Sequence, residues 1–286
     1  MDLCDIQQIK ALLARHGFRV SKSMGQNFLI QSWVPRDIAE ASGAGPGTGV
    51  LEIGPGIGPL TTQLAQRADR VVAVELDRSL QPILAETLAD RPNVSVVYGD
   101  VLKTDLAALA AERFQGLRPL VCANLPYNIT TPVITAFLEA GCFQTITVMI
   151  QREVARRICA APGTGDYGAF SVFCQYHAQT ELLFDVPPDC FLPAPKVTSS
   201  VLRLTLKEPP AEVDDPEHFF RVVKAAFAQR RKTLLNGLSA AFGSQYSKEA
   251  LSEMLADCGL PVGIRGERLG IPEFARLSKL LRQNLQ

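Results

Sequence analysis

The chain has 286 residues, of which 47% are hydrophobic, so it is long enough to bury one large core and one small core. It carries 29 basic and 29 acidic residues, so any nucleic-acid binding must come from local patches rather than from a global field. Seven scattered cysteines with no C-x-x-C pair argue against a disulfide framework or a zinc site, and they favour a reducing, cytoplasmic setting. The acidic start and the interrupted apolar stretch at residues 133–150 predict neither a secretory signal nor a membrane span.

Five short apolar runs rich in β-branched residues recur along the first half of the chain, at residues 50–53, 71–74, 94–98, 120–123 and 146–150. Helix-like stretches such as residues 60–67 and 79–89 separate them. This alternation predicts an α/β fold with a doubly wound, Rossmann-like sheet. Two later strands, at residues 181–186 and 199–206, should close one edge of the sheet and are joined by a proline-rich turn at residues 187–196.

Beyond residue 210 the pattern is helical only, at residues 216–238, 247–258 and 272–283. We therefore expect two domains, residues 1–210 and a small all-helical domain of residues 211–286. Arg230 falls on the apolar side of the first of these helices. Because an unpaired buried guanidinium is very costly, either this helix breaks near Gln229 or Arg230 pairs with a carboxylate across the domain interface.

The first strand runs into a turn with a glycine at every second position, at Gly54, Gly56 and Gly58. The second strand leads to Glu75, about 20 residues on, which is the spacing that delivers a carboxylate to a ribose diol. Glu52 precedes the glycines, and its carboxylate would repel phosphate but suit a ligand with an ammonium and a sulfonium group. The turn therefore favours S-adenosylmethionine over NAD, although Glu52 could instead cap backbone N–H groups.

Other polar residues follow the third and fourth strands, where ligands of such sheets gather. Asp100 is placed either to accept from an adenine amino group or to cap a helix. In the tetrapeptide Asn124-Leu125-Pro126-Tyr127, proline fixes the backbone, so the Asn124 carboxamide and the Leu125 carbonyl can face one pocket beside the Tyr127 ring. Two acceptors and a stacking surface suit an exocyclic adenine amine. The alternative is a proline turn with a packed tyrosine.

Two basic runs contain no carboxylate, and each is open to interpretation as a solvated face or as a nucleic-acid contact. Residues 8–22 include Lys22, and residues 221–232 include Arg221, Lys224, Arg230, Arg231 and Lys232.

Together these motifs resemble the adenine N6,N6-dimethyltransferases of ribosomal RNA, most closely the small-subunit (16S) rRNA enzymes. The matching stretches are Gly-Gln-Asn-Phe-Leu at residues 25–29, the glycine turn, Glu75, Gly99-Asp100, the tetrapeptide, Phe-Leu-Pro-Ala-Pro-Lys-Val-Thr-Ser at residues 191–199, and Gln-Arg-Arg-Lys-Thr at residues 229–233. The tetrapeptide and the Phe191 segment are shared with large-subunit enzymes, whereas the Gln-Arg-Arg-Lys-Thr stretch favours the small-subunit enzymes.

The resemblance implies a role for each matching position. Gln26, Asn27 and Leu29 would form a lid over the cofactor. Gly54 and Gly56 would contact its methionine part, Glu75 its ribose and Asp100 its adenine. Asn124 would border both the cofactor and the target base. Tyr127 would stack on the target adenine with Phe191 on its other face, and Lys196 would contact phosphate unless it merely faces solvent. No metal is implied.

The implied reaction is in-line transfer of a methyl group to the adenine amine, twice on each of two adjacent adenines near the 3′ end of 16S rRNA, with S-adenosylhomocysteine released and no general base. The expected partner is 16S rRNA within an immature small ribosomal subunit, acted on by a monomer. The alternatives are an N6-methyltransferase for large-subunit rRNA or DNA adenine, and a largely non-catalytic ribosome assembly factor.

Overall fold

The computed structural model describes residues 1–19, 26–229 and 231–284. The chain forms two compact units, the first comprising Met1–Ala155 with Gln179–Leu206 and the second comprising Arg156–Ala178 with Lys207–Gln286. The longer segment of the second unit begins at Lys207, near the expected domain boundary at residue 210. Its shorter segment, Arg156–Ala178, lies within the expected first domain. The reason is packing, because the Tyr176 side chain of this segment lies against Phe219, with ring centroids 5.5 Å apart.

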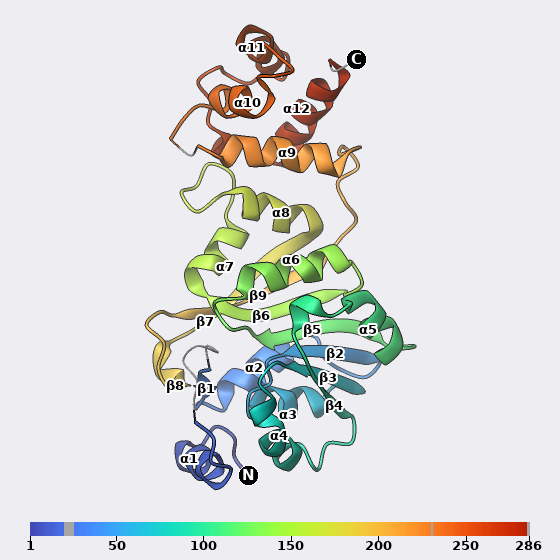
Figure 1. Cartoon of the computed structure of the whole chain (residues 1–286), viewed down its shortest axis with the longest axis vertical. Coiled ribbons are helices and arrows are strands. Elements are labelled where there is room, and N and C mark those ends of the chain that lie inside the picture. The colour runs from blue at the N-terminus through green and yellow to red at the C-terminus, as the bar shows by residue number, and fades with distance from the viewer. Residues whose placement is uncertain (20–25, 230, 285–286) are drawn as a thin grey trace. The chain divides into compact units, whose positions relative to one another are not determined.

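The first unit is built on a seven-stranded sheet in the order β4-β3-β2-β5-β6-β9-β7, and the labels in Figure 1 follow this order from β4 to β9. The strands are β2 (Thr48–Ile53), β3 (Arg70–Glu75), β4 (Val94–Tyr98), β5 (Arg118–Asn124), β6 (Thr145–Gln151), β7 (Ala178–Val186) and β9 (Ser199–Leu206). The strands from β4 to β6 in this order pair in parallel, and β9 pairs antiparallel with β6. The predicted doubly wound sheet, closed at one edge by two late strands, is confirmed.

Burial explains why the strands of this sheet could be read from the sequence. Every residue of β2 is buried, as is every residue of β3 after Arg70. Parallel strands covered on both faces appear in the sequence as continuous apolar runs. The helices that cover them are α2 (Trp33–Ala41), α3 (Pro59–Ala65), α4 (Gln81–Thr87), α5 (Leu106–Arg113) and α6 (Thr130–Ala140), and α1 (Ile6–Arg15) contributes Ile9 and Leu12 to a cluster with Phe28 and α4.

A second, two-stranded sheet was not expected from the sequence. It pairs β1 (Phe28–Leu29) with β8 (Phe191–Leu192) in antiparallel register, so that Phe28 opposes Leu192 and Leu29 opposes Phe191. The prediction that residues 187–196 are only a turn is therefore incomplete. Two residues on each strand are too few to produce a periodic signal, so only the long-range pairing defines this sheet.

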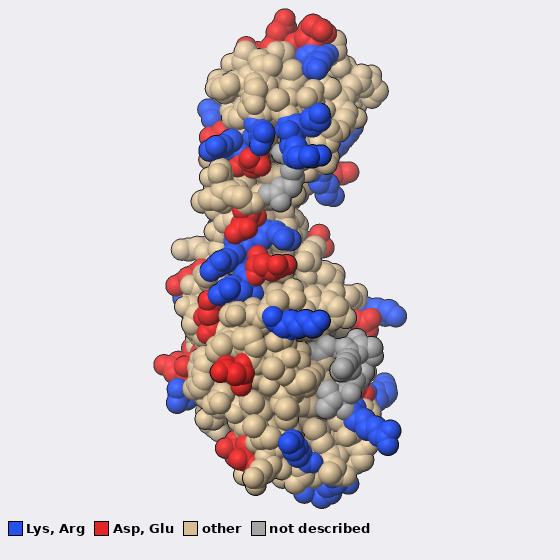
Figure 2. Space-filling model, turned by 90° about the vertical axis from the view of Figure 1, so that its left-hand side faces the viewer, with Lys and Arg blue, Asp and Glu red and all other residues tan. Residues whose placement is uncertain are grey.

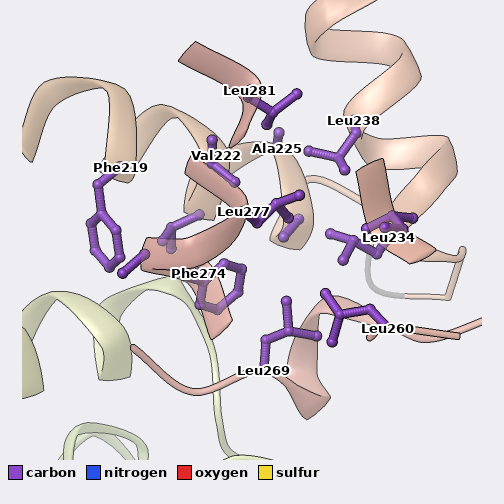
Figure 3. Packing of buried hydrophobic residues seen from close by; sticks show 14 of the residues in the cluster. Phe219, Val222, Ala225, Leu234, Leu238, Leu260, Leu269, Phe274, Leu277 and Leu281 are labelled. Atoms are coloured by element: carbon purple, nitrogen blue, oxygen red, sulfur yellow. The ribbon is translucent and has the colours of Figure 1, made fainter. Parts of the chain in front are cut away.

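The second unit is helical, with α8 (Ala169–His177), α9 (Pro216–Phe227), α10 (Leu234–Phe242), α11 (Lys248–Asp257) and α12 (Ile271–Gln283). Figure 3 shows its apolar side chains converging from α9, α10 and α12, among them Phe219, Val222, Leu234, Leu238, Phe274 and Leu277. Helix α7 (Arg152–Cys159) spans the sequence boundary between the two units.

The expected continuous helix over residues 216–238 is wrong, and the alternative of a break near Gln229 is confirmed. Helix α9 ends at Phe227, and the Thr233 hydroxyl caps α10 by accepting from the Asn236 N–H. Helix α10 folds back so closely that a Cβ at Gly237 would lie 2.4 Å from the Ala225 carbonyl oxygen. Arg230, whose placement raised the question, lies outside the described residues.

Candidate cofactor and adenine site

A cavity of about 240 Å³ opens in the first unit, where the carboxyl ends of β2, β3, β4 and β5 meet. This is the edge at which parallel sheets of this kind bind ligands. Most of the residues expected at the site line it, namely Gln26, Asn27, Gly54, Gly56, Glu75, Asp100, Asn124, Leu125, Pro126, Tyr127 and Phe191. Residues as distant in the sequence as Gln26 and Phe191 are thus brought to one cavity by the fold.

The glycine turn exposes its backbone to this cavity. Gly54, Gly56 and Gly58 all have positive φ, at 66°, 60° and 94°, a region that strains other residues. The Gly54 N–H donates to the Val74 carbonyl at 2.9 Å, which ties the turn to the end of β3. A Cβ placed on Gly54 would lie 3.9 Å from the Pro126 ring, so the turn and the tetrapeptide are neighbours.

Glu75 ends β3 with its carboxylate at the cavity wall and only 6% of the residue exposed. One carboxylate oxygen accepts from the Asp77 N–H at 2.8 Å and the other from the Gly56 N–H at 3.3 Å. Burial raises the pKa of Glu75 above its ordinary value, although these backbone hydrogen bonds oppose the shift. A partly buried acceptor beside an open glycine backbone is suited to a hydroxyl-bearing ligand such as a ribose.

Glu52 does not reach the cavity. It is 1% exposed, and the next residue, Ile53, lines the cavity instead, because neighbouring residues of a strand face opposite sides. One carboxylate oxygen of Glu52 has no hydrogen-bond partner, and burial raises its pKa to about 8, with the charge of Glu75 adding to the effect. Glu52 therefore does not contact the cavity directly, while the expectation that it lies close to a ligand in the turn stays a prediction.

The segment before β1 forms another part of the wall, through Gln26 and Asn27. The Gln26 amide donates to the Asp77 carboxylate at 2.8 Å. Leu29, which the resemblance also assigned to the lid, is instead packed in the core, 2% exposed and opposite Phe191. Phe28, not expected from the sequence, lines the cavity.

Asp100 fills one of the two roles considered for it, the helix cap, while its contact with an adenine amine stays a prediction. Its carboxylate accepts from the Leu102 N–H at 3.0 Å and so caps the short helix Val101–Lys103, and the residue also lines the cavity. Leu76 and Leu102, 55% and 43% exposed, also line this cavity. Exposed leucines beside a carboxylate acceptor are suited to a flat, amino-bearing base.

The tetrapeptide leaves the end of β5 and is held on both sides. The Leu125 N–H donates to the Met149 carbonyl at 3.1 Å, and the Tyr127 hydroxyl lies 2.7 Å from the Ser199 hydroxyl on β9. Burial raises the pKa of Tyr127, so the ring carries a neutral phenol. Ser199 was not expected to contact the site, because no local pattern reveals which strand residue meets a distant tyrosine.

The basic residues expected to bind RNA are spread over both units. Lys196 is exposed in the first unit, and Arg221, Lys224, Arg231 and Lys232 are exposed in the second, whereas Lys22 and Arg230 lie outside the described residues. Arg221 places its guanidinium 4.5 Å from the centre of the Phe242 ring. In the face drawn in Figure 2, basic and acidic side chains are mixed. Two exposed arginines on α7, Arg156 and Arg157, were overlooked although they are adjacent in the sequence.

Among residues 1–19, 26–229 and 231–284 there is no group of three or more His, Cys, Asp or Glu side chains that could hold a metal ion. Within the same described part of the chain, no helix is long and apolar enough to cross a membrane.

Comparison with solved structures places the fold. The chain matches the crystal structure of the 23S rRNA methyltransferase ErmE with a TM-score of 0.68 and 29% identity, covering 90% of this chain and 100% of that one. A dimethyladenosine transferase from Plasmodium falciparum matches with a TM-score of 0.76 and 22% identity, covering 90% and 98%. The chain therefore has the Rossmann-like fold of methyltransferases, with a helical C-terminal region.

Comparison with curated sequences narrows the class. Ribosomal RNA small subunit methyltransferase A of Shouchella clausii is 47% identical over 100% of this chain and 97% of its own, and that of Streptococcus gordonii is 46% identical over 99% of both. The family model for ribosomal RNA adenine dimethylase matches residues 17–259. The chain belongs to the ribosomal RNA adenine dimethylase family, and the resemblance predicted from the sequence is confirmed.

Proposed function

We propose that this chain transfers methyl groups from S-adenosylmethionine to N6 of two adjacent adenines near the 3′ end of 16S rRNA, dimethylating each, within an immature small ribosomal subunit. The observation that carries the proposal is the single cavity in which the glycine turn, two carboxylates and the aromatic tetrapeptide meet. The full-length similarity to small subunit methyltransferases supports this choice of RNA.

The residues around the cavity fit the cofactor. Gly54 and Gly56 offer bare backbone to the methionine part, Glu75 offers a buried carboxylate to the ribose diol, and Asp100 offers an acceptor to the adenine amine. The Gln26 and Asn27 side chains would cover the ligand from the β1 side. When bound, the cofactor would supply an electrophilic methyl group on its sulfonium.

The tetrapeptide would hold the target adenine. The Asn124 carboxamide and the Leu125 carbonyl would accept from its exocyclic amine, which favours the pyramidal form with an available lone pair. Tyr127, held by Ser199, would stack on the base, with Phe191 on the other side. No general base is invoked, because positioning and exclusion of water can lower such a barrier by up to roughly 7–11 kcal/mol.

RNA would be held by cations outside the cavity. The proposed contacts are Lys22, Lys196, Arg221, Lys224, Arg230, Arg231 and Lys232. In this proposal residues 1–210 form the catalytic domain and residues 211–286 the helical RNA-binding domain, and the enzyme works as a cytoplasmic monomer. The packing of Arg221 over Phe242 would have to be given up or shared if Arg221 contacts phosphate.

Labelled methyl transfer tests the proposal. The chain is incubated with tritiated S-adenosylmethionine and immature small subunits, with large subunits, free 16S rRNA and duplex DNA as parallel substrates. We expect label on small-subunit adenines, found as N6,N6-dimethyladenosine after digestion. Preferential labelling of large subunits or DNA would support the alternative methyltransferases, and particle binding without transfer would support a non-catalytic assembly factor.

A further inference from the structure

Asp77 follows Glu75 by two residues and is not one of the residues that line the cavity. Its side chain is nevertheless fixed by several hydrogen bonds. One carboxylate oxygen accepts from the N–H and the hydroxyl of Ser79, at 3.0 and 2.5 Å, and the other accepts from the Gln26 amide at 2.8 Å. Its own N–H donates to Glu75 at 2.8 Å. Asp77 is thus hydrogen-bonded both to Glu75, the carboxylate expected to hold the ribose, and to Gln26, the side chain expected to cover the ligand.

The Gln26 contact joins two distant parts of the chain. Gln26 lies before β1, and the pairing of β1 with β8 begins only at Phe28, so this pairing does not hold the Gln26 side chain. Asp77 lies in the turn between β3 and the short helix Arg78–Leu80, which its side chain caps. The hydrogen bond therefore connects the segment before β1 to the turn after β3, across residues that are 51 positions apart in the sequence.

The charge state of Asp77 suits this contact. Partial burial disfavours its ionised form, but the hydrogen bonds from Ser79 and Gln26 outweigh burial and lower the pKa of Asp77 below its ordinary value. Asp77 is thus a carboxylate at neutral pH, and hydrogen bonds to ionised acceptors are stronger than those between neutral groups. Gln26 is thereby oriented before any ligand arrives.

We propose that Asp77 is a positioning residue for the cofactor, which acts by holding the Gln26 side chain against the cavity and not by touching the ligand. The inference rests on the proposed function, since it takes S-adenosylmethionine as the ligand. Pre-organising one wall side chain removes the cost of ordering it on binding, so the expected effect lies in cofactor affinity.

A double-mutant cycle on the full chain tests this inference, with the dissociation constant of S-adenosylhomocysteine measured by calorimetry. Asp77→Ser keeps a hydroxyl that can cap the helix at Arg78 but is too short to reach Gln26. We expect Asp77→Ser and Gln26→Ala each to weaken binding roughly fivefold to tenfold, and the double variant to bind no more weakly than Gln26→Ala alone. Asp77→Asn, which retains both reach and cap, should bind within about threefold of wild type.

A second cycle approaches the same contact from the other side and does not depend on the folding of Asp77→Ser. Gln26→Glu sets two carboxylates against each other, so it should weaken binding several-fold more in the wild-type background than in the Asp77→Asn background, where the asparagine amide can donate. Melting curves establish that each variant is folded.

Two outcomes would overturn the inference while leaving the proposed function intact. One is wild-type affinity in folded Asp77→Ser. The other is an equal loss from Asp77→Ser with and without Gln26, or from Gln26→Glu with and without the Asp77 carboxylate, because Asp77 would then act independently of Gln26. If the wild-type chain bound neither S-adenosylmethionine nor S-adenosylhomocysteine, the proposed function would fail and this inference with it.

Discussion

The two units differ in what they bury. The first unit encloses two carboxylates, Glu52 and Glu75, whereas no acidic or basic side chain is buried among the described residues of the second unit. Burying a charge is costly, so a buried carboxylate needs a partner or a raised pKa, and both of these glutamates show the raised pKa.

This difference separates the roles that each unit can take. The first unit holds polar groups in fixed positions around a cavity, which suits ligand binding and chemistry. The second unit has an apolar core with its charges at the surface, which suits salt-dependent contact with a polyanion. Variants of buried and cavity residues in the first unit should therefore change the affinity for the cofactor, the turnover or the pH dependence of stability. Variants of surface cations in the second unit should change particle binding alone.

The largest effect is expected from Glu52→Gln on stability as a function of pH. The pKa of Glu52 is raised from 4.5 to about 8 in the folded chain, so the fold binds a proton that the unfolded chain has released. The stabilisation of the fold by this bound proton is fully present below pH 4.5 and is lost as the pH rises to about 8. Each pKa unit corresponds to about 1.4 kcal/mol, so Glu52→Gln should gain a few kcal/mol over wild type across this window.

Denaturant unfolding at several pH values measures that gain, with Glu139→Gln on α6 as the control, because Glu139 is exposed. A constant difference between Glu52→Gln and wild type at all pH values would show that Glu52 ionises normally. Glu75 would then be the one remaining buried carboxylate with a raised pKa that distinguishes the first unit from the second.

Asn124→Ala should lower single-turnover methylation of immature small subunits by roughly 10²-fold, the loss typical of removing one fixed hydrogen-bonding group from a reacting centre. The affinity for S-adenosylhomocysteine should fall by much less, since the acceptor acts as the amine pyramidalises.

Tyr127→Ala should cost about 1–3 kcal/mol of stacking, while Tyr127→Phe, which loses only the hydrogen bond to Ser199, should cost less. Wild-type rates for both Asn124→Ala and Tyr127→Ala would reduce the tetrapeptide to a structural turn.

Glu75→Ala should weaken cofactor binding by about 1.5–3 kcal/mol, because a hydrogen bond to a charged, buried acceptor is lost. Glu75→Gln retains the size of the side chain and one acceptor, so it should bind more tightly than Glu75→Ala. Calorimetry with S-adenosylhomocysteine compares them. If a folded Glu75→Ala variant kept the wild-type dissociation constant, Glu75 would have no place in the cofactor site.

The smallest effect is expected from surface cations of the second unit. Replacing Arg231 and Lys232 with alanine should leave cofactor affinity unchanged and reduce the salt dependence of particle binding by about one unit of slope per lost phosphate contact. The control is the double replacement of Arg276 and Lys279, two exposed cations of α12, which removes the same charge. An equal loss of slope in both variants would mean that net charge, and not a defined patch, drives binding.

Much of the site could be predicted because its residues occupy recognisable local positions. Glu75, Asp100 and Asn124 end or follow apolar strands, and the glycine turn needs the positive φ that glycine readily adopts. Burial on both faces makes these strands continuous apolar runs, and parallel pairing brings their ends to one edge of the sheet. For these reasons the order of elements, the doubly wound sheet, the helical region after residue 210 and many of the residues that line the cavity could be predicted from the sequence.

The tertiary structure alone decided features that depend on contacts between distant residues. These include the pairing of Leu29 with Phe191, the bond of Tyr127 to Ser199, the bond of Gln26 to Asp77, and the assignment of Arg156–Ala178 to the second unit. Glu52 illustrates the reason most clearly, since its position beside the glycine turn suggested a ligand contact, while the alternation of β2 turned its side chain away from the cavity. Local periodicity specifies which elements form, but which side chains meet is settled only when those elements pack.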